Sequence, residues 1–423
     1  MIDDAMLRLA EQGDAESQYN LGCLLYNGDG VVKDMTEATK WFCMAAEQGH
    51  AKAQHNLGVC YANGYGVTQS IGEAIKWYRR AAEQGFMGSQ RNLGMHYFVG
   101  MGVARNKAKA VKWFRLAAEQ RDSRAQYYLG RCYVDDDGIP KDVVEAAKWF
   151  RMAAEQGDVD AQYSLGVCYE NGDGVVKDMS MAAKWWRMAA EQGLAAAQYN
   201  LGVCYKNGIG LAKDVAEAVK WFRIAAEHGD ADAQINLGLC YARSESVPED
   251  MAEAVKWFRM AAEQGHVDAQ FYIGECYEKG IGVRRDKRKS VKWYRMAAEQ
   301  GHADAQFYIG ECYELGTCLK KDILKAINWY RRAAEQGHAK SQTAMAVRYA
   351  RGEGVVKDDA ESLKWYRMAA ENGDDTAQFV LGFCYHKGKW VGKDEKEAVK
   401  WFRKAAAQGN SNAEMMLDSI SEE

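Results

Sequence analysis

The chain has 423 residues, more than the roughly 250 to 300 at which one compact core usually stops growing, so several domains or a repeating architecture are expected. Its 55 Lys and Arg residues against 59 Asp and Glu residues give a net charge of −4, without the basic excess that nucleic-acid binding normally requires. Charged residues or glycines interrupt every apolar stretch well short of the roughly 20 residues of a transmembrane helix. We therefore expect no nucleic-acid partner and no membrane insertion.

The N-terminal segment and the cysteines favour a cytoplasmic location. Asp3 and Asp4 stand where a secretory signal would carry positive charge, and no long apolar run follows them. Eight of the eleven cysteines recur at one position of a repeat: Cys60, Cys132, Cys168, Cys204, Cys240, Cys276, Cys312 and Cys384. Equivalent helices of adjacent repeats pack roughly 8 to 10 Å apart, beyond the roughly 7 Å between Cα atoms that a disulfide tolerates. We expect these cysteines to be small buried hydrophobic residues of a reduced protein.

A period of 36 residues runs through the whole chain. A leucine-like residue followed by a small one recurs at this interval from Leu21 to Leu417, and a tryptophan recurs from Trp41 to Trp401. No insertion interrupts either series. A strict repeat of this length is typical of an array of identical supersecondary units.

The first half of each unit predicts a helix and a glycine turn. Ala53, Leu57 and Cys60 follow the i, i+4, i+7 spacing of one apolar helix face. A glycine beside the leucine permits close approach of a second helix. Gly64 and Gly66 then supply residues that tolerate positive φ where the helix stops and the chain reverses.

The second half of each unit predicts a capped second helix. An aspartate or serine precedes a glutamate by three residues, the spacing of a capping box or its aspartate variant. The pairs are Asp34 with Glu37, Ser70 with Glu73, Asp142 with Glu145, Asp214 with Glu217, Asp250 with Glu253, Asp358 with Glu361, and Asp394 with Glu397. The predicted core face holds Ala38, Trp41, Phe42 and Ala45, and Gly49 ends the helix.

Half-units stand at both ends of the array. Residues 1–13 match only a second helix, and residues 410–423 match only a first helix. Neither helix can bury its apolar face alone, so each repeat needs its neighbours. We predict an all-α solenoid of 24 helices: eleven repeats over residues 14–409, capped by the half-repeats 1–13 and 410–423.

The run A-x-A-Q-x-x-L-G-x-x-Y-x-x-G-x-G-V-x-x-D, followed by A-x-x-W-[YF]-x-x-A-A-E-Q-G, resembles the signature of Sel1-like repeats, relatives of tetratricopeptide repeats with a shorter turn. The resemblance covers essentially the whole chain. It implies an α/α right-handed superhelical solenoid of helix-turn-helix units that serves as an adaptor in the assembly of protein complexes. Some exported relatives carry paired cysteines that bridge the two helices of a repeat; here Cys23, Cys43 and Cys318 are isolated.

The sequence offers no candidate for catalysis, for a cofactor or for a metal. The repeated Gly-x-Gly lies between two helices, without the strand and the Gly-Lys-Ser/Thr of a phosphate-binding loop. Asp135, Asp136 and Asp137 occupy a turn but lack the spaced ligands of a calcium loop. The tryptophan series is interpreted as packing and not as a ligand box. Histidines that recur between repeats are interpreted as helix caps or linker residues: His50, His266, His302 and His338.

Three functions remain open at this stage. The first is a non-enzymatic scaffold that binds a peptide segment or a partner protein on its concave first-helix surface. The second is a hydrolase of cell-wall or β-lactam chemistry, suggested only by analogy with some relatives, since no Ser-x-x-Lys pair is present. The third is a consensus-like array without a natural partner, against which Ser244 and Ser246 at glycine positions argue.

By the tetratricopeptide resemblance, the groove would be lined by the first-helix residues two before the leucine and two, five and six after it. The position two before the leucine holds Tyr19, His55, Arg91, Tyr127, Tyr163, Tyr199, Ile235, Phe271, Phe307, Thr343 and Phe379. We call the aromatic members of this series the aromatic row. Aromatic side chains give contact area at low entropy cost, as interface anchors should. The alternative is that they only pack between neighbouring first helices.

The position just before the leucine carries an asparagine in five repeats: Asn20, Asn56, Asn92, Asn200 and Asn236. In related repeats this asparagine can hydrogen-bond the backbone of a peptide ligand; the alternative is hydrogen bonding between helices. Tyr128, Tyr272 and Tyr308 replace it elsewhere.

Four glutamates of the eighth and ninth repeats occupy equivalent groove positions: Glu275, Glu278, Glu311 and Glu314. They predict a local acidic patch, which we expect to receive a basic segment of a partner. The alternative is an ordinary solvated face.

Overall fold

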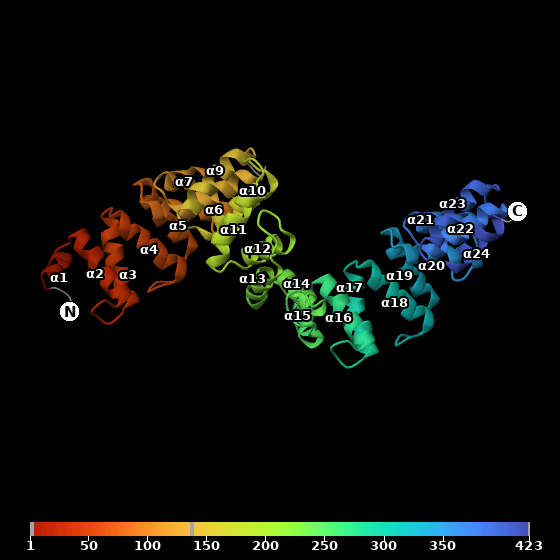
Figure 1. Cartoon of the computed structure of the whole chain (residues 1–423). Helices are drawn as coiled ribbons and strands as arrows, with labels where there is room; N and C mark the ends of the chain where they lie inside the picture. The colour runs from red at the N-terminus through yellow and green to blue at the C-terminus, as the bar shows by residue number, and fades with distance from the viewer. Residues whose placement is uncertain (1–3, 136–138, 422–423) are drawn as a thin grey trace. The chain divides into compact units, whose positions relative to one another are not determined.

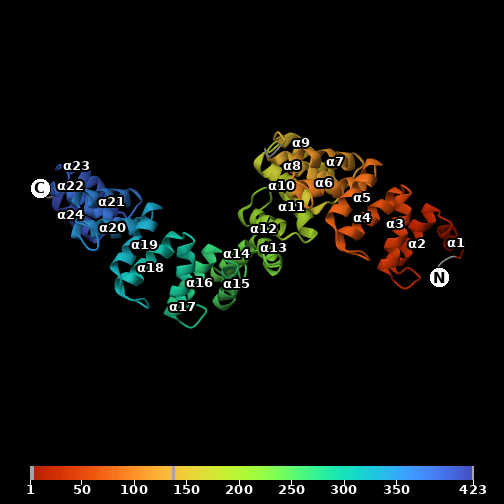
Figure 2. The ribbon, with the colours of Figure 1, turned by 180° about the vertical axis from the view of Figure 1, so that it is seen from behind.

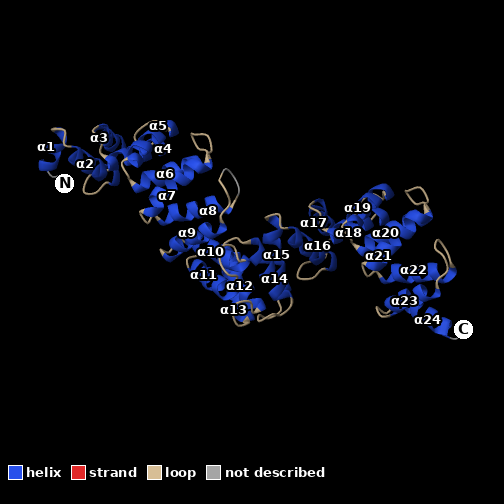
Figure 3. Ribbon diagram, turned by 90° about the horizontal axis from the view of Figure 1, so that it is seen from above, coloured by secondary structure: helices blue, strands red, loops and turns tan. Residues whose placement is uncertain are grey.

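The computed structural model describes residues 4–135 and 139–421. Within these residues it contains 24 helices and no strand, as predicted, and Figure 3 shows helices joined only by loops. Asp136 and Asp137 of the acidic turn lie outside the described residues.

The chain divides into two compact units, residues 1–214 and 215–423, which follow one another along the colour ramp of Figures 1 and 2. The first unit contains α1 (Asp4–Glu11), α2 (Ala15–Asn27), α3 (Met35–Glu47), α4 (Ala51–Asn63), α5 (Ile71–Glu83), α6 (Met87–Val99), α7 (Lys107–Glu119), α8 (Ser123–Val134), α9 (Val143–Glu155), α10 (Val159–Asn171), α11 (Met179–Glu191) and α12 (Ala195–Asn207). The second unit contains α13 (Val215–Glu227), α14 (Ala231–Ala242), α15 (Met251–Glu263), α16 (Val267–Lys279), α17 (Lys287–Glu299), α18 (Ala303–Leu315), α19 (Ile323–Glu335), α20 (Ala339–Arg351), α21 (Asp359–Glu371), α22 (Asp375–Lys387), α23 (Glu395–Ala406) and α24 (Ser411–Ser421).

Each unit is a stack of helix pairs. A first helix such as α4 packs against α5 of its own repeat and against α3, the second helix of the repeat before it. The same two neighbours recur for α6, α8 and α10 in the first unit and for α16, α18, α20 and α22 in the second. Contacts are therefore almost all between neighbouring helices, as expected of a repeat array.

The predicted helix ends are confirmed. The Asp34 carboxylate accepts hydrogen bonds from the backbone N–H groups of Thr36 and Glu37 at 3.0 and 2.9 Å. Glu37 does not complete a capping box, because its carboxylate pairs with Lys40 at 2.8 Å. The Asp34 backbone N–H donates instead to the Leu25 carbonyl across the turn, at 3.0 Å. The aspartate thus closes the turn and starts the second helix at once.

The inter-helix turns need a left-handed backbone at two positions. Gly64 and Gly66 adopt φ values of 75° and 67°. Ser244 and Ser246 adopt φ values of 56° and 57° at the same positions of a later repeat, without glycine. The turn geometry is therefore retained where its preferred residue has been lost.

One aromatic ring per repeat lies at the centre of the core. It belongs to the residue that follows the recurring tryptophan, and none of these rings is more than 7% exposed: Phe42, Tyr78, Phe114, Phe150, Trp186, Phe222, Phe258, Tyr294, Tyr330, Tyr366 and Phe402. We call them the central rings. Several recurring tryptophans, among them Trp41 and Trp77, are only half-buried. The sequence pattern placed the tryptophan and the residue after it on the same core face. In the structure the residue after the tryptophan is the more deeply buried of the two.

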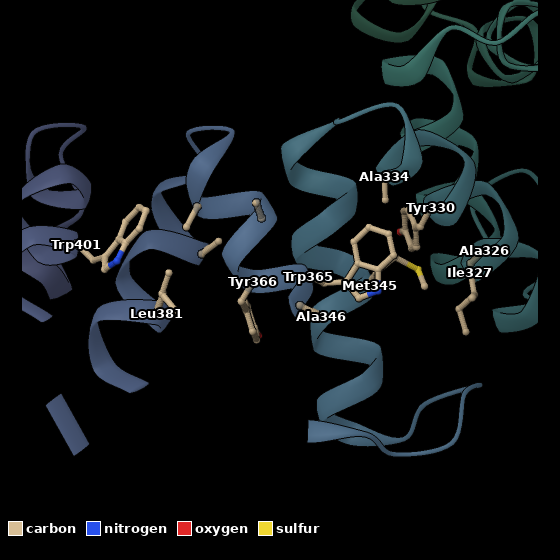
Figure 4. Close-up of a cluster of buried hydrophobic side chains, with 13 residues drawn as sticks. Ala326, Ile327, Tyr330, Ala334, Met345, Ala346, Trp365, Tyr366, Leu381 and Trp401 are labelled. Carbon is tan, nitrogen blue, oxygen red and sulfur yellow. The ribbon is translucent and has the colours of Figure 1, made fainter. Parts of the chain in front are cut away.

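In most repeats the central ring lies against the glycine beside the repeat leucine; in the tenth repeat Ala346 takes the place of this glycine. A Cβ atom on Gly58 would stand 2.6 Å from the Tyr78 ring, and one on Gly130 would stand 2.7 Å from the Phe150 ring. Real Cβ atoms essentially never make contacts this short, so an alanine in either of these two repeats would displace the ring. In the second unit, Figure 4 shows Tyr330 and Tyr366 among the buried side chains of one such cluster, with Met345 and Trp365.

A buried glutamine links each repeat to the next, a network that the sequence analysis did not foresee. The Gln54 amide nitrogen donates to the Ala46 carbonyl at the end of α3, at 3.1 Å. Its amide oxygen accepts from the Gln84 side chain at the end of α5, at 2.8 Å. Since carbonyls at helix ends lack partners within the helix, this glutamine satisfies them without solvent. The arrangement recurs at Gln90, Gln126, Gln162, Gln270, Gln306, Gln342 and Gln378.

All eight periodic cysteines are buried and none forms a disulfide within residues 4–135 and 139–421, as the sequence predicted. Burial raises the pKa of the Cys168 thiol to about 11. The thiol is therefore uncharged near neutral pH and acts as a packing group.

The contact between Gly58 and the Tyr78 ring predicts the direction in which a substitution changes stability. We expect Gly58→Ala to lower the free energy of unfolding by about 1 to 3 kcal/mol, because the added methyl group displaces the Tyr78 ring. Gly72→Ala, in the next helix, is the control: a Cβ there meets nothing within 4 Å, and alanine favours helix by up to about 1 kcal/mol. Urea unfolding of both variants measures the difference. A Gly58→Ala protein as stable as the parent would contradict this account of the core.

Candidate partner-binding surface

The aromatic row lies along the first helices, half-buried between successive repeats. The Phe271 ring of α16 packs on the central ring of Tyr294 at 5.4 Å between centroids and stacks on His302 at 4.4 Å. Tyr19 stacks in the same way on His50 at 4.8 Å, and Phe307 lies 5.1 Å from His338. These three rings therefore contribute to the joint between repeats and remain partly exposed.

The row is not uniform in exposure. Tyr127 is only 8% exposed, and its hydroxyl accepts a hydrogen bond from Arg131 at 3.0 Å. Tyr163, Tyr199 and Phe379 are half-buried, as are Tyr19, Phe271 and Phe307. The structure therefore brings most of the row to the surface and withdraws Tyr127.

Residues at the same position that are not aromatic also reach the next repeat. Arg91 pairs with Asp122, the N-cap of α8, at 2.9 Å, and Thr343 donates to Asp374, the N-cap of α22, at 2.9 Å. The His55 ring nitrogen Nδ1 lies 2.9 Å from the Ser89 hydroxyl. This position joins neighbouring repeats whatever its side chain.

The histidines between repeats are helix N-caps, as one of the two interpretations predicted. Nδ1 of His50 accepts a hydrogen bond from the Ala53 backbone N–H at 3.1 Å, while its Nε2 lies 3.0 Å from the Glu16 carboxylate. His266 stands at the same position but makes no side-chain cap bond.

The five asparagines do not share one arrangement. Asn20 is exposed, and Asn56 donates a weak hydrogen bond to the Cys23 sulfur at 3.8 Å. Asn92 bonds the Tyr78 hydroxyl, and Asn236 donates to the Asp232 carbonyl of its own helix at 3.0 Å. Asn200 borders a small hollow beside Trp186. Bonds within the fold thus engage some of these amides, and Asn20 projects from the surface.

The tyrosines that replace the asparagine pack on the central ring of the preceding repeat. Tyr128 stacks on Phe114 at 5.5 Å, Tyr272 lies 5.3 Å from Phe258, and Tyr308 lies 4.1 Å from Tyr294. The residue just before the leucine therefore points onto the preceding central ring.

Two of the four glutamates of the acidic patch are held by the fold. Glu278 accepts a hydrogen bond from the Tyr294 hydroxyl at 3.0 Å, and Glu314 accepts one from the Tyr330 hydroxyl at 2.7 Å. Glu314 also forms an ion pair with Arg348. Burial opposes the charge of Glu314, but the bonds from Arg348 and Tyr330 hold its pKa below the ordinary value.

The other two glutamates accept no hydrogen bond from a central tyrosine in the contacts described. Glu275 pairs with Lys279 at 2.6 Å. Burial, reinforced by the charges of Glu314 and Glu278, raises the pKa of Glu311. Glu311 is thus a carboxylate whose negative charge the fold itself disfavours.

Arg348 is a residue of this surface that the sequence analysis missed. It is 7% exposed, occupies the position of the periodic cysteines, and reaches both Glu314 of the preceding repeat and Glu353 of its own turn. The signal in the sequence is the single arginine in a series of cysteines. It neutralises one end of the predicted acidic patch.

No group of three metal-binding side chains converges anywhere in residues 4–135 and 139–421. None of the helices in these ranges has the length and apolar character needed to cross a bilayer.

The repeated helix pairs define an α-helical repeat protein, and the family model for the Sel1 repeat matches eleven consecutive segments of the chain. They are residues 15–50, 51–86, 88–122, 123–158, 159–194, 195–230, 231–266, 267–302, 303–338, 339–374 and 375–410. The chain belongs to the Sel1 repeat family, whose fold generally serves as a non-catalytic interaction scaffold.

Two solved structures are similar to this chain. One is a protective antigen of uropathogenic Escherichia coli strains with the same repeat fold: it is 37% identical, with a TM-score of 0.88, and the match covers 99% of this chain and 90% of the antigen. The other is a Sel1 repeat protein of Oxalobacter formigenes: it is 35% identical, with a TM-score of 0.58, and the match covers 73% of this chain and 89% of that protein. A comparison with curated proteins gives no match.

His55 makes the stability of this surface depend on pH. Burial, followed by the charge of Arg91, lowers its pKa to about 4. The histidine of the unfolded chain titrates near 6.5, so its contribution is complete above that pH and is lost as the pH falls towards 4. We expect the urea midpoint to fall between pH 7 and pH 4.5, and to fall less in His55→Tyr, which carries the residue that Tyr19 supplies in the preceding repeat. Equal losses in both proteins would contradict the assignment.

Proposed function

We propose that this protein is a scaffold that binds a peptide segment or a partner protein along the first-helix surface. The observation that carries the proposal is that packing and surface presentation fall on different positions of each repeat. Alanine, glycine, leucine and glutamine positions are buried by packing, whereas most residues at the variable aromatic and asparagine positions are partly exposed, Tyr127 and Ile235 excepted. Recognition needs such variation on a rigid support.

The aromatic row supports this proposal through its geometry. The rings of Tyr19, Phe271 and Phe307 each pack on a central ring and on an N-cap histidine, so these side chains lose little freedom when a partner covers them. Pre-ordered aromatic rings are typical of interface residues that contribute strongly to affinity.

The first test is affinity capture followed by substitution. Partners captured with the full chain should bind Tyr163→Ala, Tyr199→Ala and Asn200→Ala at least about fivefold more weakly when the three changes are combined, since a truncated anchor commonly costs more than 1 kcal/mol. Met188→Ala, exposed on the second helix α11, is the matched control and should leave affinity unchanged. Helix content by circular dichroism verifies folding. Retention of every partner by the folded triple variant would exclude this surface.

We further propose that the acidic patch receives a basic segment of the partner. Glu311 supports this, because a nearby cation would offset the burial and the charges of Glu314 and Glu278 that together raise its pKa. Glu278 and Glu314 are less suited to the role, since Tyr294 and Tyr330 already donate to them.

A basic peptide tests the patch. A fluorescent octa-lysine probe should bind the full chain, and Glu275→Gln combined with Glu311→Gln should weaken it several-fold, with the difference shrinking at high salt as charges are screened. Glu263→Gln combined with Glu299→Gln, at exposed positions of second helices, has the same net charge and serves as control. Equal binding by the two double variants would rule out a local acidic site.

A further inference from the structure

A pocket of about 230 Å³ opens on the first-helix surface between α8 and α10. The central ring of Phe150 and the side chain of Ser164 line it, with apolar walls from Val134, Val143 and Val167. Arg131 and Lys141 lie at its border together with Asp173.

The pocket lies where other repeats place an aromatic ring. Ser164 stands just before its repeat leucine, the position at which Tyr128, one repeat earlier, stacks on Phe114. Tyr128 also contacts Phe98 at 5.9 Å, and Val134 of the pocket wall is the equivalent of Phe98 one repeat later. The walls therefore correspond to those around a tyrosine ring, and the ring is replaced by a serine.

The space beside Ser164 is larger than the hollows beside Asn92 and Asn200 at the same position. At Asn200, where the amide is intermediate in size, the hollow against Trp186 is about 70 Å³. The pocket at Ser164 is about 230 Å³, larger than the roughly 150 Å³ of an apolar cavity that accommodates benzene. An aromatic ring fits this volume.

The border of the pocket adds a preference for negative charge. Arg131 and Lys141 supply two cations against one carboxylate, and Asp173 is already hydrogen-bonded by the Asn171 amide at 3.1 Å. Arg131 is held in place by its bond to the Tyr127 hydroxyl. A ring that enters from solvent therefore passes beside an oriented guanidinium group.

We infer that this pocket receives an aromatic side chain of a partner segment, flanked in that segment by carboxylates. The ring lies on Phe150 as Tyr128 lies on Phe114, and the flanking carboxylates face Arg131 and Lys141. The inference rests on the proposed function, whose partner would thus supply an acidic segment with an aromatic anchor to the first unit.

Blocked tripeptides test the inference on the full chain. Methyl NMR of ¹³C-valine-labelled protein follows the signals of Val134, Val143 and Val167 during titration with Asp-Phe-Asp, Asp-Ala-Asp or Lys-Phe-Lys. We expect saturable shifts of the three signals with Asp-Phe-Asp and none with Asp-Ala-Asp. Lys-Phe-Lys should bind roughly fivefold more weakly, the usual scale of exposed charge pairs.

Two substitutions of Ser164 distinguish the loss of binding that comes from a filled pocket from the loss that comes from an unfolded protein. Ser164→Tyr should abolish the shifts, because the fold already accepts tyrosine at this position in three repeats. Ser164→Ala leaves the pocket open and should retain them. Three results would overturn the inference: no shift with Asp-Phe-Asp, undiminished binding by the Ser164→Tyr protein, or equal binding of Asp-Ala-Asp.

The peptide titration is independent of the capture experiment. If captured partners require the first-helix surface but the pocket ignores the aromatic peptide, only the present inference fails. If the pocket binds the peptide while no partner depends on that surface, the proposed function fails and the pocket remains a site for aromatic side chains.

Discussion

The contact between a central ring and a glycine is the constraint on which most repeats depend, the tenth repeat with Ala346 being the exception. Because a Cβ at Gly58 would stand 2.6 Å from the Tyr78 ring, the two helices of the repeat meet at one separation only. That separation places the buried glutamine within reach of two helix ends, which Gln54 joins at 3.1 and 2.8 Å. Packing and buried hydrogen bonds thus occupy the same few positions in every repeat.

Other first-helix positions carry different side chains in different repeats, and these side chains cover the neighbouring central ring to different extents. The side chain before the leucine is a tyrosine in three repeats and an asparagine in five, and Ser164, Ala344 and Val380 stand there in the others. The tyrosines cover the preceding central ring, whereas Ser164 leaves a pocket beside it. Because the repeated core is regular and the first-helix side chains on it vary, each repeat can present a different local surface. This is the property that a scaffold for an extended partner requires.

The sequence was sufficient for the elements and for their boundaries. Caps such as Asp34 and left-handed turns such as Gly64 are set by local chemistry, so the period, the 24 helices and the periodic buried cysteines could all be predicted. Contacts between repeats could not. Nothing local distinguishes Trp41 from Phe42 as the central ring, and the bonds of Gln54 join residues 8 and 30 positions away.

The repeat position of each residue on the candidate surface could be predicted from the sequence, but the exposure of its side chain could not. The phase of Tyr127 is that of Phe271, yet an arginine one turn later covers part of the first, whereas a histidine of the next repeat stacks on the second. Likewise the four glutamates predicted one acidic patch, but the buried Arg348 forms an ion pair with Glu314 and neutralises one end of it. Such differences depend on which neighbour reaches the side chain, which the repeat pattern does not encode.

Photo-crosslinking to a captured partner tests the central claim most directly. A benzophenone amino acid would replace, one at a time, the exposed Phe383 of first helix α22 and the exposed Met260 of second helix α15, which are 36% and 38% accessible. The same pair of experiments would use Asn20 of α2 and Met188 of α11. The account predicts crosslinks to the partner from first-helix positions and none from second-helix positions. Crosslinks from Met188 or Met260, with none from Asn20 or Phe383, would contradict it.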